Sequence, residues 1–179
     1  MFRLSARSFA IALAVGFSCS ANSALAEAPQ LRVTALGGIE RTDSAPGSGA
    51  VDGAYYGGQI GADWKLGGLL LGVEADLGDS TASTALSGPR ANQDLFASAA
   101  VRVAVPLGDR ARVFVRGGYA YHDISYAVGP AFKGSGYTVG GGGELDLTGP
   151  LFARAEYRFN DFGQNVRGQQ FLGGLGLRF

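Results

Sequence analysis

Residues 169–179 read QQFLGGLGLRF, and this stretch decides the fold. Phe171, Leu175, Leu177 and Phe179 occupy alternate positions, so hydrophobicity repeats every two residues, which indicates a β-strand rather than a helix. One such strand neither covers a large core nor survives as a free edge, because its unpaired backbone groups would recruit another chain. The stretch is therefore predicted to be the closing strand of a larger sheet.

The same period recurs along the rest of the chain. Alternating segments lie at 31–40, 55–66, 69–78, 94–105, 111–122, 137–147 and 151–160, which with 169–179 makes eight expected strands. Each has about the length that a tilted strand needs to cross a hydrocarbon layer. No amphipathic helical pattern appears among them. The sequence predicts an all-β fold, an eight-stranded antiparallel up-and-down barrel.

The two faces of these strands differ sharply. One face carries no charge, whereas the other carries arginine, lysine, aspartate and glutamate in equal numbers of each sign. A soluble barrel with an apolar interior and a membrane barrel with an apolar exterior both produce this alternation. The alternation alone therefore does not distinguish a soluble barrel from a membrane barrel.

Aromatic side chains and loop lengths favour the membrane barrel. Two belts of aromatic residues are expected on the apolar face. The belt beside the long connections contains Tyr56, Tyr119, Tyr121, Tyr137, Tyr157, Phe159 and Phe171, and the belt at the opposite strand ends contains Trp64 and Phe179. Rings favour the two membrane interfaces. Long connections (41–54, 79–93, 123–136 and 161–168) alternate with short ones (67–68, 106–110 and 148–150), the pattern of outer-membrane barrels.

The beginning of the chain has the features of an export signal. Arg3 and Arg7 precede an apolar run from Phe9 to Phe17, and Ala24-Leu25-Ala26 forms an A-x-A cleavage pattern. We expect residues 1–26 to be a cleaved signal peptide and residues 27–179 to be one barrel domain in the outer membrane. The single cysteine, Cys19, lies in the leader, so no disulfide is expected.

Several motifs resemble a known family. The chain contains VRGGYAY at 115–121, RAEYRF at 154–159 followed by DFG at 161–163, and a terminal Phe179. It resembles the eight-stranded outer-membrane β-barrels of Gram-negative bacteria, the porin-family or opacity-type proteins. The resemblance implies surroundings of outer-membrane lipid and lipopolysaccharide, and recognition of Gly174, Leu177 and Phe179 by the barrel-assembly machinery. Leu172 departs from that signal, because a polar residue is usual there.

The charged face should line the lumen. An eight-stranded barrel is just wide enough to be filled by side chains, and buried charges are tolerated when they are paired. We expect a network formed by Arg102, Arg112, Arg116, Glu144, Asp146, Arg154, Glu156 and Arg158. The alternative is that these charges line a narrow wet path.

No motif indicates catalysis, a cofactor or a metal. His122 and Ser125 fall on opposite faces of a continuing strand, so a hydrolase is not expected. Gly140 to Gly143 lacks the residues of a phosphate loop, and Asp43, Asp52 and Asp79 lack EF-hand spacing. With 15 basic and 15 acidic residues and no basic tract, nucleic acid is not an expected partner.

The expected role is structural: a barrel that contributes to envelope integrity and presents surface-exposed loops. Two alternatives stay open, a small diffusion pore and an adhesin or surface antigen that acts through the four long loops. The extracellular partner is not predicted by the sequence.

Overall fold

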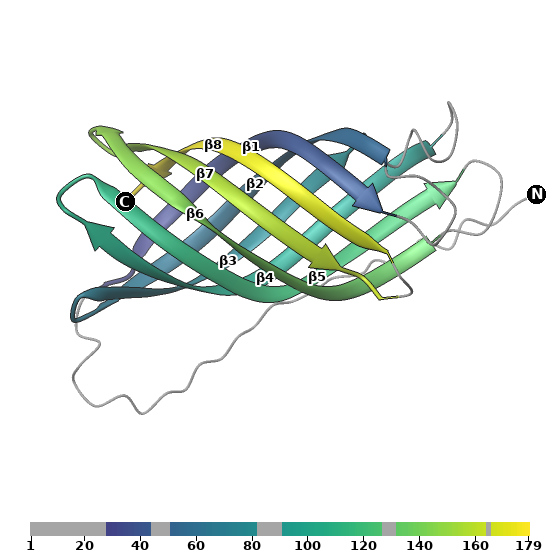
Figure 1. Ribbon diagram of the computed structural model, residues 1–179. Helices are drawn as coiled ribbons and strands as arrows, with labels where there is room; N and C mark the ends of the chain where they lie inside the picture. Colours follow the sequence, from purple (N-terminus) through teal and green to yellow (C-terminus); the bar gives the residue numbers. More distant parts are fainter. Residues whose placement is uncertain (1–27, 44–50, 82–90, 127–131, 164–165) are drawn as a thin grey trace, which may run out of the picture.

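A closed barrel of eight antiparallel strands makes up the protein, as predicted (Figure 1). The computed structural model describes residues 28–43, 51–81, 91–126, 132–163 and 166–179. The strands are β1 (Gln30–Asp43), β2 (Val51–Leu66), β3 (Leu69–Ser80), β4 (Ala91–Leu107), β5 (Ala111–Tyr126), β6 (Phe132–Thr148), β7 (Leu151–Asp161) and β8 (Arg167–Arg178). The expected signal peptide, residues 1–26, lies outside the described residues.

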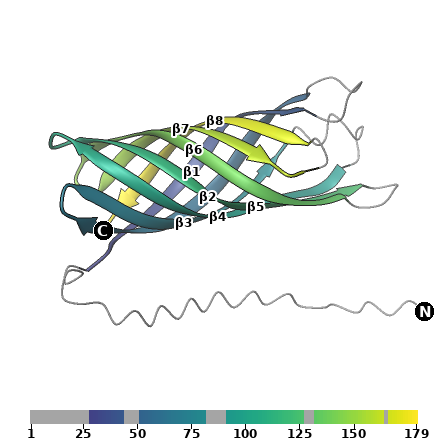
Figure 2. The same cartoon turned by 60° about the horizontal axis from the view of Figure 1, so that its bottom comes forward.

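Each strand pairs with the next in the sequence, and β8 pairs with β1 to close the barrel. At the closing seam, the N–H of Leu31 donates to the carbonyl of Phe179 over 3.0 Å, and the N–H of Phe179 donates back over 2.9 Å. The terminal aromatic residue is thus part of the sheet. Figure 2 shows the strands inclined to the barrel axis, as closure of an eight-stranded sheet requires.

The two ends of the barrel differ. At one end, here called the turn end, the connections β2–β3, β4–β5 and β6–β7 are tight and each contains a glycine with positive φ: Gly67, Gly108 and Gly149. The C-terminus lies at this end (Figure 1). The other end, here called the loop end, carries the four longer connections.

Several strands extend further toward the loop end than the alternation indicated. β5 continues to Tyr126 and β6 begins at Phe132, whereas the sequence suggested boundaries near 122 and 137. Backbone pairing continues to Ile124↔Phe132. Hydrophobic alternation appears only where one face of a strand is in an apolar environment and the other in a polar one. The part of a strand that extends past the apolar layer lacks this alternation, so the sequence pattern predicts a loop there.

The outer face is apolar and exposed, and the inner face is polar and buried. Exposed residues of the outer face include Ile60, Val101, Val115, Leu175 and Leu177. The alternation of exposed and buried residues along β3 and β7 follows the period of two. Within the described residues, no helix is long and apolar enough to cross a membrane.

Apolar side chains fill the lumen near both ends. Toward the turn end, Phe114 packs with Leu70 and Ala104. Toward the loop end lies a second cluster, which also contacts Val166: Leu36, Tyr55, Phe96, Ala120, Phe162 and Leu172. Phe162 follows the last residue of β7, so the chain beyond that strand contributes to the filling of the lumen. Charged side chains lie between these clusters.

Candidate functional site: a buried charge network across the lumen

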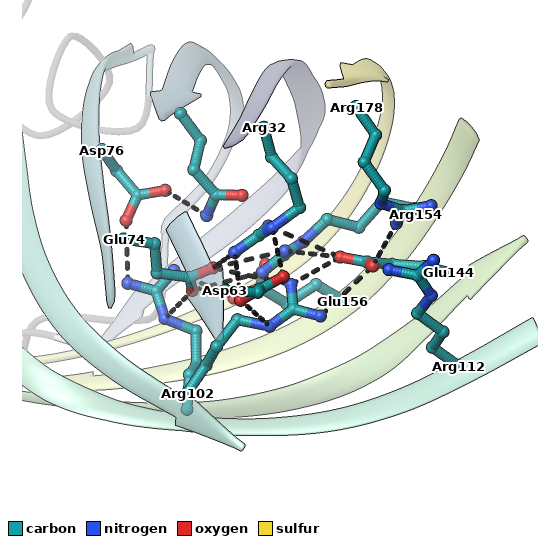
Figure 3. Close-up of polar contacts among 12 residues, drawn as sticks. Arg32, Asp63, Glu74, Asp76, Arg102, Arg112, Glu144, Arg154, Glu156 and Arg178 are labelled. Carbon is teal, nitrogen blue, oxygen red and sulfur yellow. Dashed lines mark hydrogen bonds and ion pairs between the residues drawn. The ribbon is translucent and has the colours of Figure 1, made fainter. Parts of the chain in front are cut away.

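Glu74 on β3 is one centre of the network (Figure 3). Its carboxylate lies 2.9 Å from Nε of Arg116, 3.3 Å from Nη2 of Arg154 and 3.4 Å from Nη2 of Arg32. These arginines come from β5, β7 and β1. One carboxylate therefore ties together strands on several sides of the barrel.

Glu144 on β6 is a second centre. Its Oε1 lies 2.6 Å from Nη1 of Arg102 and 3.1 Å from Nη1 of Arg154, and its Oε2 lies 2.7 Å from Nη2 of Arg178. Arg102 donates through both terminal nitrogens to both carboxylate oxygens, a bidentate geometry that fixes the two groups relative to each other.

A third group lies toward the loop end. Asp76 is 2.8 Å from Nη2 of Arg116 and 3.3 Å from Nη2 of Arg158, and it also accepts a hydrogen bond of 2.6 Å from the hydroxyl of Ser98. Glu156 joins this group to the rest, because it contacts Arg116, Arg154 and Arg158 at 3.2, 2.7 and 3.0 Å.

The turn end of the network is less buried. Arg112 contacts Asp146 at 3.4 Å and donates to Gln30 over 2.8 Å, and Arg178 also pairs with Asp146. Arg112 and Asp146 keep partial solvent exposure, whereas the side chains of Arg102 and Glu144 have none.

Aromatic rings lie against several guanidinium groups of the network. The guanidinium groups of Arg154 and Arg102 lie 4.0 and 4.7 Å from the centre of the Phe114 ring. Arg158 lies 5.8 Å from the centre of the Phe96 ring. Cations over ring faces are attracted by the ring quadrupole, and desolvation strengthens the attraction. These three guanidinium groups are thus packed against aromatic rings.

All eight residues predicted for the network lie in the lumen and form ion pairs with one another or with other lumenal charges. The prediction omitted five further members: Arg32, Asp63, Glu74, Asp76 and Arg178. Their parity also places them on the charged face, whose side chains the sequence predicts to pair across the lumen, but the named members were confined to four consecutive strands, β4 to β7. Because the barrel is narrow, charged side chains on opposite strands also come into contact. Lys65, on the same face, lies exposed at the turn end.

The predicted belt residues lie on the outer face. Tyr56, Tyr119, Tyr137, Phe171 and Phe179 are more than half exposed, and Trp64, Tyr121, Tyr157 and Phe159 are less so. Four tyrosine hydroxyls of the loop-end belt bond to the next strand: Tyr56 to Asp79, Tyr119 to Ser135, Tyr137 to Asp161 and Tyr157 to Gln169. Each tyrosine ring thus points outward, and its hydroxyl group forms a hydrogen bond near the loop end of the barrel.

The residues of the expected assembly signal lie at the closing seam. Leu177 and Phe179 point outward, and Gly174 has lumen parity. Leu172, the departure from the family pattern, is buried in the lumen against Leu36 in the loop-end cluster. In this cluster a leucine packs with apolar side chains at a position where the family usually has a polar residue.

The remaining candidates are placed as follows. His122 is buried in the lumen, where its ring lies 5.3 Å from that of Phe162 and 6.4 Å from that of Phe96. Gly140 to Gly143 lie within β6. Asp79 bonds to Tyr56 and to the N–H of Ser80. The side chains of Asp43 and Ser125 and the connection 44–50 lie outside the described residues.

The family model of the outer membrane protein beta-barrel domain matches residues 10–179. The chain belongs to this family. Comparison with curated proteins gave no match.

Solved outer-membrane barrels share the fold at low sequence identity. Neisserial surface protein A is 16% identical, with a TM-score of 0.57 over 83% of this chain and 97% of that one. The attachment invasion locus protein Ail of Yersinia pestis is 10% identical, with a TM-score of 0.64 over 86% and 99%. The N-terminal barrel of Pseudomonas aeruginosa OprF is 16% identical, with a TM-score of 0.56 over 84% and 97%. The protein is an integral outer-membrane β-barrel, in agreement with the sequence prediction, and such a barrel suits a structural or surface role.

Proposed function

We propose that this barrel is a non-conducting, non-enzymatic anchor that contributes to envelope integrity and holds its four loops at the cell surface. The observation that carries the proposal is the cross-lumen network centred on Glu74 and Glu144. The side chains of its inner members have no solvent exposure, and they form ion pairs with side chains of several other strands.

A diffusion pore would require these pairs to separate or to line a continuous water path. Separating them exposes buried charges without partners, which costs several kcal/mol for each pair. Phe162 and Phe96 add an apolar obstruction at the loop end. Both features favour a plug over a pore.

The non-enzymatic part rests on the placement of His122. Its ring packs against Phe96 and Phe162 inside the lumen, away from the lipid face. An enzyme that processes membrane lipids would need this group accessible from the bilayer.

The expected partners of the barrel follow from its aromatic belts and from its closing strand, β8. Outer-membrane lipid and lipopolysaccharide would surround the loop-end belt, where tyrosine rings suit the boundary between headgroups and acyl chains. The barrel-assembly machinery would act on the strand that ends at Phe179. Export would use residues 1–26 as a cleaved signal peptide, which mass spectrometry of the protein purified from outer membranes tests directly: a first residue other than Glu27 contradicts that cleavage site.

Conductance in a planar bilayer tests the central proposal. The folded protein should give no steady current steps. The double variant Glu74→Ser with Arg154→Ser, which removes both charges of one cross-lumen pair and keeps the net charge of the lumen, should conduct more often. Reproducible steps from the unmodified protein would contradict the plug and would favour the diffusion pore.

A further inference from the structure

Glu40 stands apart from the charge network. It lies on β1 toward the loop end and is 4% exposed. Its carboxylate accepts hydrogen bonds of 3.3 Å from the hydroxyl of Thr42 and from Nε2 of Gln170. Among the described residues, no arginine or lysine forms an ion pair with it, whereas the network carboxylates each contact at least one guanidinium. A buried carboxylate held only by two long neutral hydrogen bonds is poorly compensated.

The side chains beside Glu40 also lack partners. Gln170, Asn160 and Thr138 are fully buried on β8, β7 and β6. In the part of the chain that the structure describes, Oε1 of Gln170, Oγ1 of Thr138 and both amide atoms of Asn160 have no hydrogen-bond partner. Buried polar atoms are nearly always bonded to protein or to a bound group. Unpartnered atoms on three adjacent strands therefore point to an occupant.

Gly168 provides the space for that occupant. It is buried and is the register partner of Asn160 on one side and of Thr42 on the other. A Cβ atom built at Gly168 would lie 3.4 Å from Oε1 of Glu40 and 3.8 Å from Nδ2 of Asn160. The missing side chain thus leaves a position that the carboxylate and the amide both face.

We propose that Glu40, Asn160, Gln170 and Thr138 form a binding site for one monovalent cation, Na⁺ or K⁺. Hard cations prefer carboxylate, amide and hydroxyl oxygens. Rotation of the Asn160 amide about its last side-chain bond exchanges Nδ2 for Oδ1 and breaks no hydrogen bond, so the carbonyl oxygen Oδ1 can face the ion.

The charge of the site selects a monovalent ion. Glu40 is its one carboxylate, and Arg158, the register partner of Gln170, adds positive charge nearby. A divalent ion would leave an uncompensated positive charge in a buried position. The described residues contain no group of three or more histidine, cysteine, aspartate or glutamate side chains suited to a metal ion, which also disfavours a divalent site here.

The ion would enter from the loop end. Glu40 directly follows Ile39, whose register partner Phe171 belongs to the loop-end belt, so the site lies near the outer interface and beyond the charge network. The site is independent of the proposed anchoring role, because it neither opens the lumen nor alters the network. It would instead join β6, β7, β8 and β1 across the closing seam.

Thermal unfolding of the folded barrel in detergent tests the site. At constant ionic strength, replacement of tetramethylammonium chloride by NaCl or KCl should raise the unfolding midpoint in a saturable way. Glu40→Gln should abolish this dependence. Gly168→Ala should abolish it too, because the added methyl group occupies the site at ordinary contact distance from Glu40.

The matched control is Gly173→Ala on the same strand but on the outer face, where the new methyl group would lie 3.9 Å from the carbonyl of Gly37. It should keep the full cation dependence. Crystals grown with thallium(I), a heavy substitute for K⁺, should show anomalous density between Glu40 and Asn160.

Equal midpoints in all three salts, together with no thallium density, would overturn the proposal and leave water as the occupant. Cation dependence that survives both Glu40→Gln and Gly168→Ala would place the ion elsewhere. Stabilisation by CaCl₂ alone would contradict the monovalent assignment. If Glu40→Gln does not fold, Gly168→Ala and the thallium experiment still decide the question.

Discussion

Glu74 and Arg154 are 80 positions apart in the sequence, yet Oε1 of Glu74 lies 3.3 Å from Nη2 of Arg154. They come from β3 and β7, which lie opposite each other in the order of the closed barrel. Contact between opposite walls means that the lumen is spanned by side chains.

Glu74→Gln should destabilise the folded barrel strongly. The substitution keeps the size of the side chain but removes the charge that faces Arg32, Arg116 and Arg154. Breaking a buried ion pair from one side costs about 3–5 kcal/mol. Urea unfolding in detergent measures the change. Asp109→Asn, in the exposed β4–β5 turn, is the control and should change stability little; equal losses would contradict a network that stabilises the barrel.

Val115→Arg should impair insertion. Val115 is 63% exposed on the outer face, between the tight turn at 108–110 and the belt residue Tyr119. An arginine at the bilayer midplane of a barrel costs about 2–4 kcal/mol. Refolding yield into lipid vesicles, read from the gel shift on boiling, measures the effect. Val115→Leu should refold normally, and normal refolding of the arginine variant would show that this face does not contact lipid.

Two neighbouring glycines of β6 should differ in how much stability is lost when each is replaced by alanine. A Cβ atom at Gly142 would lie 2.9 Å from Cα of Glu156 and closer still to the carbonyl oxygen of Ala155, so Gly142→Ala forces β6 and β7 apart. At Gly143, a Cβ atom would lie 3.6 Å from the carbonyl oxygen of Arg112, which leaves room. Thermal unfolding should show a clear loss for Gly142→Ala and almost none for Gly143→Ala. Equal effects would mean that strand spacing does not depend on Gly142.

Phe162→Ala should lower stability without opening a channel. The ring is buried in the loop-end cluster and lies 5.3 Å from the ring of His122. Replacing a buried phenylalanine by alanine costs about 3–5 kcal/mol in a protein core. The network beyond it stays intact, so planar-bilayer recordings should remain silent. Steady current from this variant would identify Phe162, rather than the charges, as the barrier.

The period of two divided each strand into an apolar and a charged face, and the aromatic belts and loop lengths then decided that the apolar face points to lipid and the charged face to the lumen. The period of two was sufficient for pairs on adjacent strands: Glu144 and Arg154 flank a tight turn and are register partners. The pairing of Arg154 with Glu74 depends on closure and on the stagger of the strands, which no local pattern records.

The cluster around Glu40 was not predictable in the same way. Asn160, Gln170 and Thr138 have lumen parity, but neutral polar residues alternate with apolar ones in many strands and carry no distinctive spacing. Their lack of partners, and the room left by Gly168, become visible only when four strands are placed side by side.

The cross-lumen ion pairs also bear on how the barrel forms. Arg154 takes acceptors from β3, β6 and β7, and Glu74 takes donors from β1, β4, β5 and β7. Glu144 also takes a donor from β8, Arg178. A sheet that has not closed leaves some of these groups without their partners, so it would have to keep its charges hydrated until β8 meets β1. Closure and dehydration of the interior are then one event. The barrel should unfold as a single cooperative unit, and loss of one strand should not leave a stable seven-stranded remnant.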